Sequence, residues 1–540
     1  MIMKTLRFLL LFCPLPLLAQ TWPLLQQVDG DGQENVAALI ALSGGGTVAA
    51  GTYSGSSPFE GGAPSQGKAD LFIARYSESG AVDWSLEGGA SENDEVAGIA
   101  QMPGGDLVIA GSYWFELSLG DTTLGTGSSV RSLFLSRMTP EGQTVWAQRF
   151  SGAGLKDIAN VAILPDTSLL VAGFFKNTLE LGDSVITTAA APGSTSLFLA
   201  AFSPQGELRW ATQAGGEGNL RITAMATAPD GQIAVGGTFD GIATLAGTTL
   251  DAGFFNQDVF LAAFSPEGEA LWARDLGGVI EDNLKGIAVD SLGNIYATGN
   301  IIGVMNLSEA LSIESSNGND DFFLVKYAPD GAPLWGRALG GPDVQNGNAV
   351  AVQGDFVIVG GGFQGAIGWD GLNADVGADD VIWGFAAGFN PNGEARWLRA
   401  IPTNDLGLIN TFAFTPQRRL LAGGTFGQTG SFNGTNLSSI GSLSGFWGRM
   451  ADMLTPVPPA PEPDGRAITA FPNPTTGQVH LAPFPTGIQP LLLDVNGRRL
   501  PITPDASGTF DLSGWPGGWY LIILPREGRP PVRLPVLKAR

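Results

Sequence analysis

The chain has 540 residues, with 51 acidic and 28 basic side chains and a formal net charge of −23. A surface of this sign repels phosphate backbones, which argues against nucleic-acid binding. Glycine contributes 78 residues, about twice its usual share of roughly 7%. Because glycine disfavours helices, this content favours many short strands joined by tight turns. A hydrophobic fraction of 44% is ample for a large core and excludes a disordered chain.

Residues 1–20 have the features of a secretory signal peptide. Lys4 and Arg7 form a basic flank before an apolar run, and we expect cleavage between Gln20 and Thr21. The apolar run is shorter than the roughly 20 residues of a membrane-spanning helix, and no later segment is long enough. We therefore expect an exported protein with no transmembrane segment in its mature chain.

Cys13 is the only cysteine. Phe12, just before it, is bulky where a lipoprotein signal requires a small residue, so the lipoprotein interpretation is the weaker one. Loss of Cys13 with the signal peptide excludes disulfides, thiolate metal sites and a cysteine nucleophile.

Three markers recur every 62 residues or so, and such a fixed period indicates a repeat architecture. The first marker is tryptophan, at Trp22, Trp84, Trp146, Trp210, Trp272, Trp335 and Trp397. The second is a glycine two residues before a mostly aromatic position, at Gly51, Gly111, Gly173, Gly237, Gly299, Gly361 and Gly424. The third is phenylalanine in an apolar run, at Phe72, Phe134, Phe198, Phe260, Phe323, Phe385 and Phe446.

A turn of constant form separates each phenylalanine run from the next tryptophan, as in Thr139-Pro-Glu-Gly142. Proline at the second position and glycine at the fourth suit a type I turn and predict a hairpin. Each unit also holds a second pair of apolar runs, which gives four strand candidates. A weaker final stretch, such as Leu117–Leu124 or Leu179–Ile186, predicts a fifth strand or a long decorated loop.

Four strands in a unit of this length are typical of a propeller blade, whose sheets are covered on both faces. An open β-solenoid is the alternative, but its coils are usually shorter. The repeats begin at Thr21 on a tryptophan strand and end near Met453 after a phenylalanine strand. We therefore expect the two ends to share one blade and close a seven-bladed β-propeller over residues 21–453.

The glycine/aromatic strand, the turn, the tryptophan and the Asp-x-Phe or Ser-x-Phe strand together resemble bacterial SBBP-type propeller repeats. The last of these motifs begins at Asp70, Ser132, Ser196, Asp258, Asp321 and Ser444, and Trp383 departs from it. The resemblance covers residues 21 to about 453 and implies a secreted or surface scaffold.

Residues 454–465 form a proline-rich linker, which we expect to be extended. Residues 466–540 predict a small β-sandwich of short strands separated by glycine turns. Their motifs resemble the type A C-terminal sorting domain of the type IX secretion route of Bacteroidetes, with sorting-motif residues Pro472, Asn473, Pro474, Gly477, Asp494, Gly497, Gly518 and Tyr520. The resemblance implies that the type IX machinery is a partner, and that the domain is cleaved off or exchanged for a lipopolysaccharide anchor.

Residues that could carry catalysis are few. His480, the only histidine, lies on a candidate strand of the sorting domain, which excludes a Ser-His-Asp triad or a multi-histidine zinc site in the propeller. Acidic pairs could hydrolyse glycosides, but they are common in so acidic a chain and are more simply solvated turns. These pairs are Glu281-Asp282, Asp320-Asp321 and Asp379-Asp380.

Asp29, Asp31 and Glu34 resemble a calcium loop, although the distal Glu of an EF-hand is missing. We expect no cofactor and keep calcium as the alternative. The tryptophans could stack on sugars, but their regular recurrence favours packing between or at the edges of blades.

The sequence thus predicts a non-enzymatic scaffold that reaches the cell surface or medium after Sec export to the periplasm. We expect it to bind an extracellular glycan or protein, or to serve a structural role at the surface. The alternative is an extracellular polysaccharide hydrolase or lyase that uses carboxylates of the propeller loops.

Overall fold

The structure is a computed structural model that describes residues 22–125, 130–253, 256–277, 282–316, 320–377 and 381–450. Nearer the C-terminus it describes residues 469–471, 478–482, 490–494, 500, 503–505, 509–516, 518–526 and 529–538. The chain divides into two compact units, Met1–Met453 and Leu454–Arg540. The predicted signal peptide, with Gln20 and Thr21, and the predicted linker lie outside the described residues.

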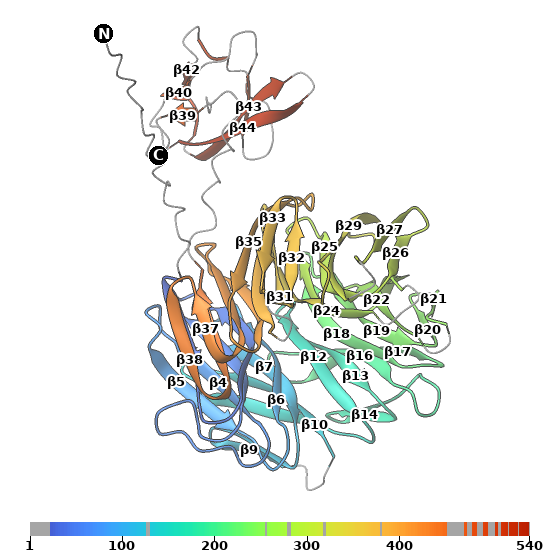
Figure 1. The fold of residues 1–540 in the computed structure, drawn as a ribbon. Coiled ribbons are helices and arrows are strands. Elements are labelled where there is room, and N and C mark those ends of the chain that lie inside the picture. The colour runs from blue at the N-terminus through green and yellow to red at the C-terminus, as the bar shows by residue number, and fades with distance from the viewer. Residues whose placement is uncertain are drawn as a thin grey trace, which may run out of the picture. The chain divides into compact units, whose positions relative to one another are not determined.

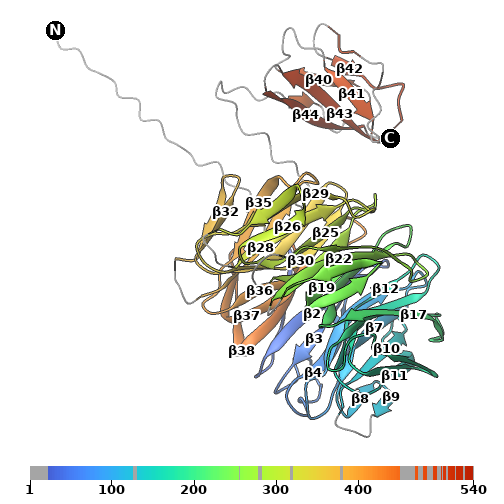
Figure 2. The same ribbon diagram turned by 90° about the vertical axis from the view of Figure 1, so that its right-hand side faces the viewer.

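The first unit is built from seven four-stranded antiparallel blades (Figures 1 and 2). Blade 1 holds β2 (Glu34–Ala41), β3 (Thr47–Tyr53), β4 (Asp70–Tyr76) and β5 (Val82–Gly88). Blade 2 holds β6 (Glu95–Gln101), β7 (Leu107–Tyr113), β10 (Ser132–Met138) and β11 (Thr144–Phe150). Blade 3 holds β12 (Lys156–Ile163), β13 (Leu169–Phe175), β16 (Ser196–Phe202) and β17 (Leu208–Gly216).

Blade 4 holds β18 (Leu220–Thr227), β19 (Ile233–Asp240), β22 (Gln257–Phe264) and β23 (Ala270–Asp275). Blade 5 holds β24 (Asn283–Val289), β25 (Ile295–Ile301), β28 (Asp321–Tyr327) and β29 (Pro333–Leu339). Blade 6 holds β30 (Gln345–Gln353), β31 (Phe356–Phe363), β34 (Trp383–Phe389) and β35 (Ala395–Ile401). Blade 7 holds β36 (Gly407–Phe414), β37 (Leu420–Phe432), β38 (Thr435–Arg449) and β1 (Leu24–Val28).

The first strand of each blade contacts the first strand of the next, and β36 returns to β2, which makes the ring of a seven-bladed β-propeller. This arrangement confirms the predicted propeller and excludes an open solenoid. The core lies between blades, since each cluster of buried side chains joins neighbouring sheets. All seven residues of β7 are buried, as expected for a sheet that is covered on both faces. Among the described residues there is no helix with the length and apolar character needed to cross a membrane.

The recurring glycine has a steric cause. A Cβ atom at Gly51 in β3 would lie 1.7 Å from the carbonyl oxygen of Asn35 in β2. The pairing of β2 with β3 shifts at this point, between Val36 and Ala38. This bulge brings the two backbones so close that no side chain fits.

The predicted turns are also confirmed. The amide of Gly142 donates to the carbonyl of Thr139 at 3.0 Å, and Gly142 has φ 83°. Such a type I turn followed by a left-handed residue shifts the strand register by one, which is observed between Arg137 and Met138.

The two ends of the first unit meet in blade 7, as predicted. β1 pairs antiparallel with β38, with Leu24 opposite Arg449 and Val28 opposite Gly445. The outer strand of this blade therefore comes from the beginning of the chain, and its first three strands come from residues about 400 positions later. Pairing of β1 covers the edge that β38 would otherwise expose.

The stretch between the second and third strands of a blade forms a two-stranded hairpin in five blades. Four of these hairpins form separate two-stranded sheets instead of the predicted fifth strand, and the remaining one adds two strands to the sheet of the preceding blade. They comprise β8 (Glu116–Leu119) with β9 (Thr122–Gly125), β14 (Thr178–Leu181) with β15 (Ser184–Thr187), β20 (Ile242–Leu245) with β21 (Thr248–Asp251), β26 (Val304–Ser308) with β27 (Leu311–Glu314), and β32 (Ala366–Trp369) with β33 (Leu372–Asp375). The β20–β21 hairpin also extends the sheet of blade 3 through β17.

The second unit contains two three-stranded sheets, β39-β40-β42 and β41-β43-β44. Their strands are β39 (Thr469–Phe471), β40 (Gln478–Ala482), β41 (Leu491–Asp494), β42 (Thr509–Asp511), β43 (Gly518–Arg526) and β44 (Arg529–Lys538). Buried side chains of both sheets, among them Val479, Phe510 and Ile522, belong to one apolar cluster. The β-sandwich expected for this unit stays a prediction.

Candidate functional site

The predicted acidic residue Asp282 is buried, with an exposed fraction of 0%. Its Oδ1 accepts a hydrogen bond from the amide of Ile302 at 3.2 Å. Burial, followed by the nearby charges of Asp258 and Asp320, raises the pKa of Asp282 to about 7. A carboxyl group with this pKa could transfer protons, but its burial keeps it away from a substrate in solution.

Asp282 belongs to a recurring position at the start of the innermost strand, either its first residue or the residue directly before it. Glu34 and Asp94 hold the same place in blades 1 and 2, both are buried, and burial raises the pKa of each to about 7. Asp94 accepts hydrogen bonds from the amides of Ala90 and Trp114, both at 2.7 Å. Lys156 takes this place in blade 3 and donates to three backbone carbonyls, which include that of Gly152 at 2.8 Å.

This position ties the connection between two blades to the inner strand, which is a structural role. Asp94 and Lys156 do not stand out in the sequence, since the position holds different residue types. Its constant feature is its place two residues before the first buried apolar residue of the inner strand, as in Asp94 before Val96 and Lys156 before Ile158.

Of the other predicted acidic pairs, Asp321 is buried and accepts a hydrogen bond from the amide of Ser316 at 2.5 Å. Burial raises the pKa of Asp320 and of Asp321 above the ordinary range of aspartate. Glu281, Asp379 and Asp380 lie outside the described residues.

The aspartates of the predicted calcium loop accept hydrogen bonds from different residues. The carboxylate of Asp29 accepts the amide of Ile440 at 3.2 Å and the hydroxyl of Ser444. Asp31 accepts the amide of Ser56 at 2.5 Å, and this bond lowers its pKa. In the part of the chain that the structure describes, no three histidine, cysteine, aspartate or glutamate side chains form a group that could hold a metal.

The recurring tryptophans pack between blades. The indole nitrogens of Trp84 and Trp146 donate to the carbonyls of Pro140 and Pro204 in the next blade, at 3.0 and 3.1 Å. Trp272 and Trp335 repeat this contact with Pro329 and Pro391. Trp22 departs from the series, because Leu24 stands in the register position that Trp84 holds in blade 1.

Trp22 instead packs edge-on against Phe432 and Phe446 of its own blade. No turn connects β38 to β1, so nothing in the local chain fixes the register that the other tryptophans share.

In the second unit, His480 lies half-buried on β40, and its Nδ1 is 2.5 Å from the hydroxyl of Thr509. Among the sorting-motif residues, Tyr520 is buried and its hydroxyl donates to the carbonyl of Pro516 at 2.7 Å. Gly518 begins β43 and Asp494 ends β41. The remaining motif residues lie outside the described residues, namely Pro472, Asn473, Pro474, Gly477 and Gly497.

Polar side chains of the inner strands are joined across four neighbouring blades. Lys285 in blade 5 donates to Oδ1 of Asn348 in blade 6 at 3.2 Å, and Asn348 donates to Asn410 in blade 7 at 3.4 Å. Asn410 in turn donates to Asn35 in blade 1 at 2.8 Å. Separately, Arg131 forms ion pairs with Glu95 on β6 and Asp157 on β12, which join blades 2 and 3. We call the series from Lys285 to Asn35 the belt.

A cavity of about 530 Å³ opens beside this belt where blades 7 and 1 meet, at the start of β2. We call it the mouth cavity. Its described lining is mostly amide, hydroxyl and aliphatic, and consists of Gln33, Glu34, Asn35, Thr52, Ser54, Lys68, Ala69, Asn93, Leu406, Leu408, Asn410, Thr425 and Leu443. None of these residues is aromatic, and Glu34 is the one carboxylate among them. The arrangement offers hydrogen-bond donors and acceptors without a pair of acidic groups for catalysis.

Residues 276–304 match the family model of the SBBP β-propeller repeat. These residues run from the end of blade 4 through β24 and β25. The matched segment coincides with strands of the observed ring. The chain is a β-propeller repeat protein.

The β-propeller repeat protein is also 22% identical over 369 residues to an uncharacterized WD repeat-containing protein, L264, of Acanthamoeba polyphaga mimivirus. That match covers 55% of this chain and 26% of the viral protein, so the chain spans about a quarter of the relative's length.

Comparison with solved structures finds BamB from Moraxella catarrhalis, with 13% identity, TM-score 0.34 and coverage of 78% of this chain and 98% of that one. The WD40 domain of Neurospora crassa Pan2 has 8% identity, TM-score 0.38 and coverage of 78% and 97%. A putative 6-phosphogluconolactonase from Bacteroides uniformis has 12% identity, TM-score 0.37 and coverage of 74% and 98%.

Proposed function

We propose that this protein is a secreted or cell-surface binding scaffold that holds an extracellular glycan at the mouth cavity and does not act on it chemically. The main support for the proposal is the lining of the mouth cavity, where Asn35, Asn410 and their neighbours present amides and hydroxyls. Glycosidases usually need two carboxyl groups on either side of the bond that is cleaved. Glu34, the one carboxylate of the described lining, is 1% exposed.

Neutral sugars suit such a lining. Their hydroxyl groups both donate and accept hydrogen bonds, as asparagine and threonine side chains do. The belt from Lys285 to Asn35 also holds these side chains in place before a ligand arrives, which lowers the entropy that binding must overcome.

The proposed route to the outside rests on the sequence. The signal peptide would direct the chain to the Sec pathway, and the motifs from Pro472 to Tyr520 resemble a type IX sorting domain. The partner in export would be the type IX machinery. Deletion of residues 466–540 in a host with this route should leave the propeller in the periplasm, whereas surface delivery of the shortened chain would contradict this part of the proposal.

The binding proposal is tested with an array of neutral extracellular polysaccharides and the Asn410→Ala variant. This substitution removes an amide of the cavity lining, together with the hydrogen bonds that join Asn410 to Asn348 and Asn35. Loss of the hydrogen bonds that this amide would make to a glycan, about 1–2 kcal/mol, should weaken binding by roughly tenfold. Asn306→Ala is the matched control, because Asn306 is exposed on β26, away from the mouth cavity. Equal affinity of both variants for every bound glycan would contradict the mouth as the binding site.

A further inference from the structure

The ring closes at the junction between blade 7 and blade 1. The side chain that fills this junction differs from the tryptophan found at the corresponding place between blades 1 and 2. Leu24 lies opposite Arg449, in the register that places Trp84 opposite Arg75 in blade 1. A smaller side chain without a hydrogen-bond donor thus takes the place of an indole.

The turn of blade 1 that contacts Leu24 also differs from its counterpart in blade 2. A Cβ atom at Gly80 would lie 2.7 Å from Cδ1 of Leu24, just as one at Gly142 would lie 2.7 Å from the indole of Trp84. Glu78 stands two residues before Gly80, where the corresponding turn of blade 2 has Pro140. The junction between blades 7 and 1 therefore has a smaller side chain, Leu24, and an additional carboxylate, Glu78.

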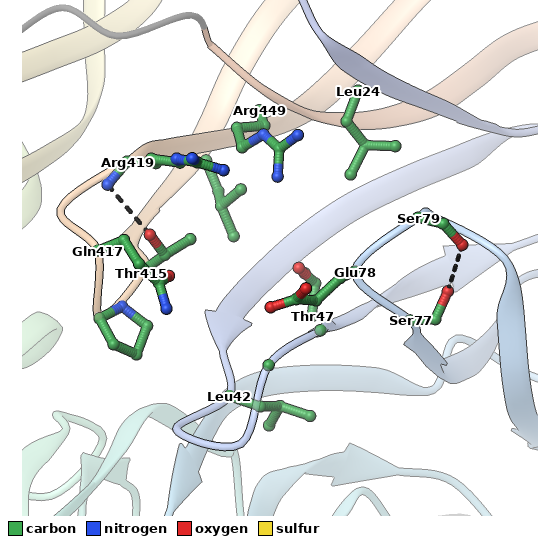
Figure 3. A pocket seen from close by; sticks show the side chains of 14 residues that line it. Leu24, Leu42, Thr47, Ser77, Glu78, Ser79, Thr415, Gln417, Arg419 and Arg449 are labelled. Carbon is green, nitrogen blue, oxygen red and sulfur yellow. Dashed lines mark hydrogen bonds between the residues drawn. The ribbon is translucent and has the colours of Figure 1, made fainter.

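A cavity of about 550 Å³ lies at this junction, and we call it the closure pocket (Figure 3). Its size is within the range of about 300–1,000 Å³ that is usual for small-molecule sites. Leu24, Leu42 and Leu421 supply its apolar surface. It lies at the end of β2 opposite to the mouth cavity, since Glu34 at the start of β2 lines the mouth and Leu42 just after its end lines the closure pocket.

Two arginines line the pocket where another blade has an ion pair. In blade 2, Nε of Arg137 contacts Oδ2 of Asp106 at 2.7 Å, and Asp106 directly precedes β7. The same two places in blade 7 hold Arg449 and Arg419, which directly precedes β37. Replacement of the aspartate by arginine leaves two like charges at one wall of the pocket.

These guanidinium groups lack partners among the described residues. In blade 1, Nη1 of Arg75 donates to the carbonyl of Pro140 at 2.6 Å, but no hydrogen bond or ion pair of the Arg419 or Arg449 side chain occurs in the described part of the chain. Figure 3 shows both side chains reaching into the pocket from blade 7, while Glu78 enters from blade 1. Two cations and one carboxylate make the pocket locally positive in a strongly acidic chain.

We infer that the closure pocket binds an acidic sugar unit, with its carboxylate held by Arg419 and Arg449. Guanidinium groups form strong, paired hydrogen bonds with carboxylates. The apolar ring face of the sugar would lie on the leucines, and its hydroxyls would reach Thr47, Ser77 and Ser79, which also line the pocket. The inference shares its ligand class with the proposed function but concerns a separate site, at the other end of β2.

The test is calorimetric titration of the purified whole chain with a galacturonic acid trisaccharide. The wild-type protein should bind it, and Arg449→Gln should weaken binding by about tenfold or more because the charge-assisted hydrogen bonds are lost. Arg419→Asp restores the ion pair of blade 2, so it should abolish binding and raise the melting temperature together. That gain separates a lost site from a misfolded protein. Arg418→Gln is the matched control, since Arg418 lies in the same turn but does not line the pocket.

Two further ligands sharpen the result. The methyl ester of the trisaccharide has no charge and should not bind, whereas a sulfated trisaccharide tests for a general anion site. Binding that is unchanged in Arg449→Gln and Arg419→Asp would overturn the inference, as would binding of the sulfated sugar alone or no binding of the trisaccharide. Because Asn410→Ala leaves the closure pocket intact, this variant should still bind galacturonate even if no neutral glycan binds the mouth.

Discussion

The indole nitrogen of Trp84 donates a hydrogen bond of 3.0 Å to the carbonyl oxygen of Pro140, which belongs to the next blade. Arg75, directly opposite Trp84 in the sheet, donates to the same oxygen at 2.6 Å. One carbonyl of a turn therefore receives two donors from the neighbouring blade. The contact recurs with donors from blades 2 and 5, which reach Pro204 and Pro391 of the following blades, so it is a general contact between neighbouring blades.

Removal of the indole donor should weaken this fastening measurably. Trp84→Phe keeps a ring in place but loses one hydrogen bond, which predicts a fall in the free energy of unfolding of about 1 kcal/mol by urea titration. Trp397→Phe is the matched control, because Trp397 is equally part of the series but its buried indole nitrogen has no partner among the described residues. An equal loss in both variants would show that ring packing alone, and not the hydrogen bond, carries the effect.

Stability should depend on pH through the three buried carboxyls at the starts of inner strands. Glu34, Asp94 and Asp282 each have a pKa of about 7 in the folded protein, against about 4 in an unfolded chain. The folded state therefore binds more protons than the unfolded state between pH 4 and 7. The resulting stabilisation is complete below pH 4 and is lost as the pH rises through 7.

We expect these three groups together to lower the free energy of unfolding by more than about 1 kcal/mol between pH 5 and pH 8. Asp282→Asn should reduce this slope, because the amide keeps the acceptor for Ile302 and carries no charge. Asp370→Asn is the control, since the hydrogen bond and charge of Arg337 lower the pKa of Asp370 to about 2. This group stays ionised from pH 5 to 8, so its replacement should leave the slope in that range unchanged. A urea midpoint that is constant from pH 5 to 8 in the wild type, with no change in Asp282→Asn, would contradict the assignment.

Because β1 closes the ring, its deletion should cause a defect that loss of the outer strand of another blade would not cause. Deletion of Leu24–Val28 exposes the edge of β38, which is otherwise paired over five residues. Exposed edges recruit other strands, so the shortened protein should melt at a lower temperature and elute as oligomers in gel filtration. Val185→Ala, at an exposed position of the β14–β15 hairpin, should leave both properties unchanged. A monomeric deletion variant of normal stability would refute closure by this strand.

Much of the propeller can be predicted from the sequence because each marker has a local cause. Gly51 is required by the close approach of the Asn35 carbonyl, and Gly142 by its left-handed conformation in the turn. Such causes repeat in every blade and leave a period in the sequence. The position of Trp22 could not be predicted in this way, since its register depends on pairing with a strand that lies at the other end of the unit.

The candidate sites are harder to predict than the fold. Asn35 and Asn410 lie 375 positions apart and meet only when the ring closes. The like charges of Arg419 and Arg449 become meaningful only beside the Asp106–Arg137 pair, which occupies the same two places in another blade. Because loops of different blades tolerate different residues, sites between blades leave no period in the sequence.

The central claim, binding without chemistry, is tested most directly by following bound protein and released sugar in the same samples. The purified chain would be incubated with a panel of extracellular polysaccharides, with calcium and with chelator. We predict that at least one polysaccharide retains the protein and that no new reducing ends or unsaturated products form. Loss of retention in chelator would show that binding requires calcium. Release of shortened sugars by the wild-type protein would contradict it and establish an enzyme.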